Sequence, residues 1–146
     1  MKVLLDSDVL IEHFRHGRDD DALARLLSRS LLYMSSVVAM ELSAGCRSDK
    51  DVRVLDGFLR PFERTGRTVH PDYSSWRRAG TSLVRLRQDF HLNAQKRRAL
   101  ANDLLIGWCA VQIGAVVVTN NLADFRLIQK VTPLRWAGTI QDALRL

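Results

Sequence analysis

The segment that decides the fold is MKVLLDSDVLIEHF, residues 1–14. An apolar run, Val3–Leu5, is followed by two carboxylates, Asp6 and Asp8, and then by a second apolar pattern. The run predicts a short buried strand, and the pattern after it predicts a helix. Because an unpaired carboxylate is costly to bury, acids at the end of a core strand need a structural or a functional explanation.

The same two patterns continue along the whole chain. The helix after the first strand is expected at residues 8–17, with Ser7 or Asp8 as N-cap and Gly17 at its end. Strands are expected at residues 2–5, 31–35, 66–71, 115–120 and 134–138. Further helices are expected at 19–30, 36–45, 49–62 (ending near Pro61), 73–90, 102–114 and 122–131, with 91–100 as a basic loop or a helix start.

Strands that alternate with helices predict an α/β fold, a three-layer sandwich with a mostly parallel central sheet flanked by helices. We expect a single domain spanning residues 1–146. In such sheets ligands bind outside the carboxyl ends of the strands. Asp6 and the segment TNNLADF, residues 119–125, both lie at such ends.

The composition, 47% apolar and 26% charged, is that of an ordinary folded domain. The uncharged run at 104–123 is better explained by a helix followed by a strand than by a membrane span. The N-terminus does not fit a secretory signal, and no membrane association is expected. The two cysteines, Cys46 and Cys109, lie far apart, which argues against a disulfide framework or a zinc site and predicts a cytoplasmic protein.

The positive charge is concentrated in one part of the chain. Residues 60–98 hold ten Lys/Arg and three acids, a net charge of +7, whereas the whole chain carries +6. A localised basic surface is typical of proteins that bind nucleic acids, although a solvated helix face is the simpler alternative. The candidate RNA-binding residues are Arg77, Arg78, Arg85, Arg87, Lys96, Arg97 and Arg98.

Four acids stand within or next to apolar segments: Asp6, Glu41, Asp103 and Asp124. Each alone has a structural explanation, as a cap, a solvent-facing helix residue or a loop acid, and Asp8 fits an N-cap better than a ligand. Together they predict an oxygen-only site without His or Cys, which suits Mg²⁺ or Mn²⁺ better than zinc. An acidic metal site beside a basic surface suggests cleavage of a phosphodiester.

Three segments, LLDSDVLIEHF, SSVVAMELSAG and ANDLLIGWCAVQIGAVVVTNNLADF, and their order along the chain resemble the PIN-domain ribonucleases. The resemblance is strongest to the VapC-type toxins of bacterial type II toxin–antitoxin systems. It implies that Asp6, Glu41 and Asp103 ligate one or two Mg²⁺ or Mn²⁺ ions, and that water attacks the phosphodiester in line. The fourth acidic position is expected at Asp124, with Asn121 as a neutral or water-binding neighbour and Thr119 as the hydroxyl that lines the site.

The resemblance also implies a homodimer, a structured RNA substrate such as tRNA or rRNA, and inhibition by a cognate antitoxin. An arginine of that antitoxin is expected to pair with Asp6 or Asp103. Three other functions stay open on the sequence. They are an inactive RNA- or antitoxin-binding module, a DNA nuclease, and a haloacid-dehalogenase-like phosphatase, which also begins with D-x-D but is at odds with Leu10.

Overall fold

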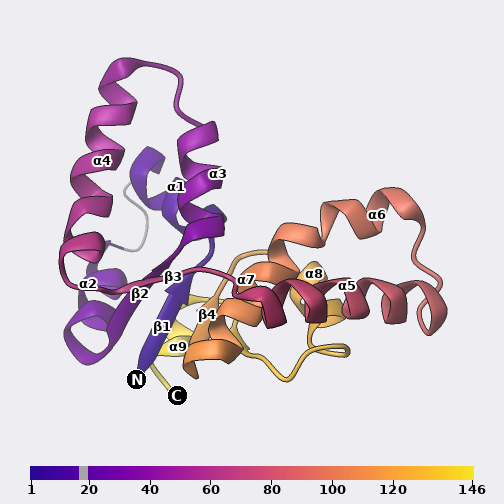
Figure 1. Cartoon of the computed structure of the whole chain (residues 1–146). Helices are drawn as coiled ribbons and strands as arrows, with labels where there is room; N and C mark the ends of the chain where they lie inside the picture. The colour runs from indigo at the N-terminus through magenta and orange to yellow at the C-terminus, as the bar shows by residue number, and fades with distance from the viewer. Residues whose placement is uncertain (17–19) are drawn as a thin grey trace.

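The computed structural model describes residues 1–16 and 20–146, so the helix end predicted at Gly17 lies outside the described residues. Five strands form one sheet in which every pairing is parallel. They are β1 (Lys2–Leu5), β2 (Leu31–Ser35), β3 (Thr68–Val69), β4 (Val116–Val118) and β5 (Arg135–Ala137). Their order is β3-β2-β1-β4-β5 (Figure 1).

The helices follow the strands in alternation, which confirms the α/β class. They are α1 (Ser7–His16), α2 (Asp20–Arg29), α3 (Ser36–Ala44), α4 (Asp49–Arg64), α5 (Tyr73–Gln88), α6 (Ala94–Ala99), α7 (Ala101–Ile113), α8 (Leu122–Ile128) and α9 (Ile140–Ala143). In Figure 1, α3 and α4 stand side by side on one side of the sheet, and α5 and α6 extend to the other. Within the described residues, no helix combines the length and the apolar character that crossing a membrane would require.

The strand order contains one reversal of direction. From β1 the chain moves to β2 and β3 on one side, whereas β4 and β5 lie on the other side of β1. Right-handed crossovers therefore place the helices that connect β1 to β3 and those that connect β3 to β5 on opposite faces of the sheet, whereas α9, after the last strand, packs against α2. The reversal leaves a crevice at the carboxyl ends of β1 and β4, which is where parallel sheets bind ligands.

The helix expected at residues 102–114 is α7, which is almost entirely apolar and largely buried. Leu104, Ile106, Cys109 and Ala110 are fully buried, and α7 packs on β1, β4 and α5. The helix ends at Gly114, whose φ of 67° is the left-handed conformation that glycine adopts without strain. This packing fixes α7, and with it Asp103 in its first turn, against the carboxyl edge of the sheet.

The predicted start of α1 and the predicted end of α4 were wrong. Helix α1 begins at Ser7, so Ser7 and Asp8 lie inside the helix, and Asp6 is the residue that flanks its start. Helix α4 runs through Pro61 to Arg64, because Phe62 is buried in the core and the loss of a single N–H in the last turn is tolerated.

The C-terminal helix α9 was not predicted. Its start is marked by Thr139, whose hydroxyl accepts a hydrogen bond from the backbone N–H of Asp142 at 3.0 Å. The side chain of Asp142 in turn accepts from the Thr139 hydroxyl at 2.7 Å. The pattern T-x-x-D before an apolar pair is a known helix-start signal and would have predicted this element.

Candidate functional site

Asp6 lies at the carboxyl end of β1 and is 4% exposed. Its backbone N–H continues the sheet by donating to the Val118 carbonyl at 2.9 Å. One side-chain oxygen accepts from the Ser7 N–H at 2.8 Å, and the other accepts from the Thr119 hydroxyl at 2.7 Å. Burial, followed by the negative charge of Asp8, raises the pKa of Asp6 to about 6 although both hydrogen bonds oppose the rise.

Thr119 follows β4 and is fully buried, as a residue that lines the site should be. Its hydroxyl donates to Asp6 and accepts from the Asn121 N–H at 2.9 Å. Its own N–H donates to the Ala137 carbonyl at 3.1 Å. Thr119 therefore joins the ends of two neighbouring strands and fixes the direction of the turn that leads to α8.

Asp8 also belongs to this site, which the sequence analysis did not predict. One of its oxygens accepts from the Asn120 N–H at 3.1 Å, and the Thr119 hydroxyl lies 3.5 Å from the same oxygen. The other oxygen, Oδ1, is buried and has no hydrogen-bond partner within the described part of the chain. Burial raises the pKa of Asp8, although hydrogen bonds from the Asn120 and Val9 N–H groups and from the Thr119 hydroxyl oppose the rise.

Asp103 and Asp124 are brought together by an amide. The Asn121 side-chain N–H group lies 3.0 Å from an oxygen of Asp124 and 3.4 Å from an oxygen of Asp103. Burial, and then the charges of Asp6, Asp124, Glu41 and Asp8, raise the pKa of Asp103 to about 7. The other three predicted acids thus act on the Asp103 carboxyl, together with Asp8.

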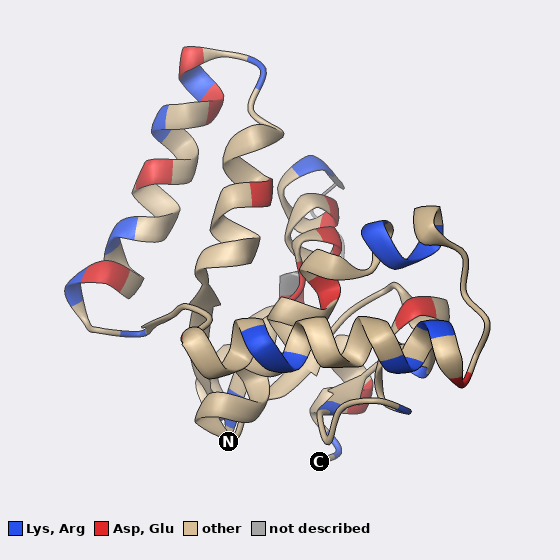
Figure 2. Ribbon diagram, turned by 45° about the vertical axis from the view of Figure 1, so that its right-hand side comes forward, with Lys and Arg blue, Asp and Glu red and all other residues tan. Residues whose placement is uncertain are grey.

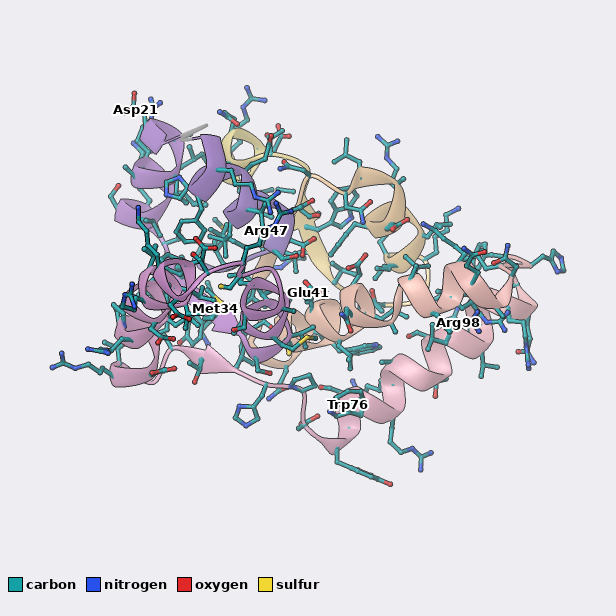
Figure 3. The ribbon with its side chains drawn as sticks, turned by 90° about the horizontal axis from the view of Figure 1, so that it is seen from above. Asp21, Met34, Glu41, Arg47, Trp76 and Arg98 are labelled. Carbon is teal, nitrogen blue, oxygen red and sulfur yellow. The ribbon has the colours of Figure 1, made fainter. Side chains whose placement is uncertain are left out.

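Glu41 reaches the site from α3 and is held by a neighbour of Asp103. The Asn102 side chain donates to Glu41 at 2.8 Å, which links α3 to the start of α7. In Figure 3 Glu41 lies near the centre of the molecule, as expected for a residue of the crevice. Asn102 was not predicted, because only its position next to Asp103 in the sequence marks it as different from any other polar residue.

The basic residues predicted to bind RNA lie on α5 and α6, which run next to each other and to α7. In Figure 2 the blue segments of α5 and α6 lie beside a central group of red, acidic segments. Several of these residues also contribute to the fold. The Arg78 guanidinium lies 5.2 Å from the centre of the Trp108 ring, Arg97 donates to the Leu92 carbonyl, and Arg85 pairs with Asp89 at 3.6 Å.

Arg77, Arg85, Arg87 and Arg98 are exposed, and Figure 3 shows Arg98 on the α6 side of the molecule, beyond α7. Lys96 differs from them because its ammonium group forms an ion pair with Asp124 at 2.5 Å. The basic surface therefore meets the acidic site at one point, where α6 lies next to α8.

The donor atoms of the site suit a hard divalent cation. They are carboxylate oxygens without His or Cys, three of the acids have raised pKa values, and Asp8 has a buried oxygen without a hydrogen-bond partner among the described residues. Within the described residues, however, no three His, Cys, Asp or Glu side chains already stand at the spacing of metal ligands. The residues fit Mg²⁺ or Mn²⁺ by their chemistry, and the arrangement is an acidic cluster and not a closed coordination sphere.

The family model of the PIN domain matches residues 3–130. The chain belongs to the PIN domain family. PIN domains are in general nucleases, so the haloacid-dehalogenase-like alternative is set aside in favour of this family. No curated protein sequence matches the chain.

Solved structures of toxin–antitoxin complexes share the fold. VapBC-1 from nontypeable Haemophilus influenzae has a TM-score of 0.71 and 20% identity, covering 97% of this chain and 99% of that one. VapBC2 from Rickettsia felis, bound to a DNA fragment from its promoter, has a TM-score of 0.69 and 22% identity, covering 94% and 98%. DNA-bound VapBC from Salmonella typhimurium has a TM-score of 0.70 and 22% identity, covering 94% and 97%. At these identities the likeness concerns the fold.

Proposed function

We propose that this PIN domain protein is a metal-dependent endoribonuclease of the VapC type, the toxin of a toxin–antitoxin pair. The observation that carries the proposal is the acidic cluster at the ends of β1 and β4, in which the pKa of Asp6 is raised to about 6 and that of Asp103 to about 7. Carboxylates held this close to one another are costly unless a cation joins them. The basic helices α5 and α6 beside the cluster supply a surface for a polyanionic substrate.

Asp6, Glu41 and Asp103 would hold Mg²⁺ or Mn²⁺, and Asp124 is the fourth predicted ligand. The bound cation would lower the pKa of a water molecule and neutralise charge on the phosphodiester. The other residues orient these acids: the Thr119 hydroxyl fixes the Asp6 carboxylate, and the Asn102 amide fixes Glu41. Asp8, with its unpartnered oxygen, is a further oxygen donor at the same place.

An antitoxin is the proposed protein partner. A groove of about 330 Å³ lies between α1, α3 and α4, and apolar side chains line much of it, among them Ile11, Phe14, Leu42, Val54 and Leu55. Such a groove suits the apolar face of an amphipathic helix. VapBC structures are among the solved neighbours, and an arginine of the antitoxin is proposed to pair with Asp6 or Asp103.

The remaining parts of the proposal rest on the resemblance to VapC-type toxins. They are a homodimer, a location in the cytoplasm, and a structured RNA such as tRNA or rRNA as the substrate. The basic residues on α5 and α6 are proposed to hold that RNA through its phosphates.

The test is cleavage of total bacterial RNA by the purified protein with Mg²⁺ or Mn²⁺ and with EDTA, alongside Asp103→Asn. Discrete cuts are expected with metal only, and the variant should lose at least about 100-fold in rate because it removes a charged group from the site. The amide keeps the shape of the carboxyl, so circular dichroism should show an unchanged fold. Full activity in the variant would contradict the proposed site. RNA binding without cleavage by the wild-type protein would favour an inactive binding module.

A further inference from the structure

Lys96 is the basic residue that connects the RNA-binding surface to the acidic site. Its ammonium group lies 2.5 Å from an oxygen of Asp124, 28 residues further along the chain. Its neighbour Arg97 turns back to the Leu92 carbonyl, and Arg98 is exposed. Of the three consecutive cations of α6, Lys96 alone has an acidic partner among the described residues.

The backbone N–H and the side-chain ammonium group of Lys96 each have a partner that fixes their position. Its backbone N–H donates to the side chain of Asn93, the N-cap of α6, at 2.8 Å. Its ammonium group is held by Asp124, whose side chain is 13% exposed, whereas the Lys96 side chain is 41% exposed. The ammonium group is thus anchored on the protein side and open to a ligand on the other.

Asp124 has protein partners on both of its oxygens. One belongs to the Lys96 pair, and the other accepts from the Asn121 side chain at 3.0 Å. Asn121 also reaches Asp103, so a continuous polar chain runs from α6 through Asp124 to the acid on α7. In this arrangement Asp124 offers no bare oxygen to a cation, and its structural effect is to place a positive charge at the rim of the site.

We propose that Lys96 binds a non-bridging oxygen of the scissile phosphate, and that Asp124 acts as the residue that positions Lys96. The inference rests on the proposed ribonuclease function and specifies how its substrate is held. An ammonium group has three N–H donors and acts on phosphate as a point charge, so Lys96 can keep Asp124 as a partner while it binds a phosphate oxygen. A positive charge fixed in advance at this place stabilises the charge that develops during cleavage.

The test compares Lys96→Met with Arg126→Met, which removes one exposed positive charge from α8, the helix that carries Asp124. For Lys96→Met we expect kcat to fall on the order of 100-fold, with Mn²⁺ affinity unchanged in calorimetric titrations. Arg126→Met should change neither, and Lys96→Arg should recover part of the loss. An equal loss of kcat in Lys96→Met and Arg126→Met would overturn the proposal, because net charge alone would then explain it.

Asp124→Asn distinguishes a positioning residue from a metal ligand. Under the proposal its loss of kcat resembles that of Lys96→Met, the double variant is no worse than either single variant, and Mn²⁺ affinity stays the same. A loss of Mn²⁺ affinity in Asp124→Asn alone, with multiplied rate losses in the double variant, would overturn it. The double variant also removes both charges of the pair, so it guards against a folding defect caused by one unpaired partner.

RNA binding without cleavage separates this inference from the proposed function. In EDTA, Lys96→Met should lower the affinity for RNA and reduce the slope of log K against log salt by about 1, and Arg126→Met should not. If the wild-type protein cuts no RNA with any metal, the proposed function fails. If Lys96→Met binds RNA with unchanged affinity and slope, the role of Lys96 fails whether or not RNA is cut.

Discussion

The acidic crevice at the ends of β1 and β4 and the basic helices α5 and α6 are neighbouring regions. They differ in the sign of their charges and in how far those charges are exposed to water. In the crevice, Asp6 is buried and Asp103 half-buried, both accept hydrogen bonds from neutral groups, and both have raised pKa values. On α5 and α6, arginine side chains face water, which screens them at little cost. The negative charges of the crevice thus lower the stability of the folded protein, whereas the positive charges of α5 and α6 do so very little.

This difference shows which of the two regions is evidence for a function, because a destabilising arrangement needs an explanation and a neutral one does not. A solvated cation on a helix surface costs almost nothing, so a basic block alone is weak evidence of a partner. A buried oxygen without a partner, such as Oδ1 of Asp8, lowers stability and persists only if something compensates for it. The crevice is therefore the stronger evidence for a bound ligand, and the predictions below test this contrast.

The largest expected effect concerns the charge of Asp103 in the absence of metal. Its pKa is 3.8 in the unfolded chain and about 7 in the folded protein. Between these values the unfolded state loses its proton first, so the free energy of unfolding should fall as pH rises from about 4 to about 7 and stay low above. The shift corresponds to at most about 4 kcal/mol.

Urea unfolding in EDTA at pH 5 and pH 8 measures this fall in the free energy of unfolding. Asp103→Asn should be more stable than the wild-type protein at pH 8 and should show a weaker dependence on pH. Added Mn²⁺ should stabilise the wild-type protein at pH 8 and have a much smaller effect on the variant. If the wild-type protein is equally stable at both pH values in EDTA, the charge of Asp103 does not destabilise the fold, and the proposed difference between the crevice and the basic helices is wrong.

A smaller effect is expected from Thr119, the uncharged residue that holds the crevice together. Thr119→Val keeps the shape of the side chain but removes the hydrogen-bond partner of one Asp6 oxygen and of the Asn121 N–H, which should cost about 2 kcal/mol of unfolding free energy. Thr119→Ser is the matched control, since it keeps the hydroxyl and loses one buried methyl group, about 1 kcal/mol. If both variants are equally stable in urea, the hydroxyl does not support the site.

The sequence predicted the parts of this molecule that depend on local pattern. Apolar runs located the strands, and the cost of burying acids identified Asp6 and Asp103. Contacts between distant segments were not predictable in this way. The Lys96–Asp124 pair and the Asn102–Glu41 hydrogen bond join residues 28 and 61 positions apart, and only the packing of the helices α6, α8, α7 and α3 brings them together.

The helix face of α5 shows the same limit. Its spacing predicts a helix, but Trp76 is 59% exposed, and the buried residues include Ser75 and Ser82. The hydroxyls of these serines have partners on packed segments, since Ser75 lies 3.3 Å from Gln112 and Ser82 accepts from the Trp108 N–H at 3.4 Å. The apolar pattern alone cannot predict which face of α5 is buried, because that choice depends on hydrogen bonds to polar groups of α7.

The smallest expected effect concerns the basic helices. Arg97→Ala with Arg98→Ala should weaken RNA binding modestly and reduce the slope of log K against log salt by up to about 2, since each phosphate contact contributes slightly less than 1. Arg25→Ala with Arg29→Ala on α2 is the matched control, because it removes two exposed charges of the same kind outside the basic block. Filter binding at several salt concentrations measures both. A change confined to the α6 variant would mean that α6 is part of the RNA surface, whereas equal changes would mean that only net charge matters and that the solvated-face explanation of the basic block is correct.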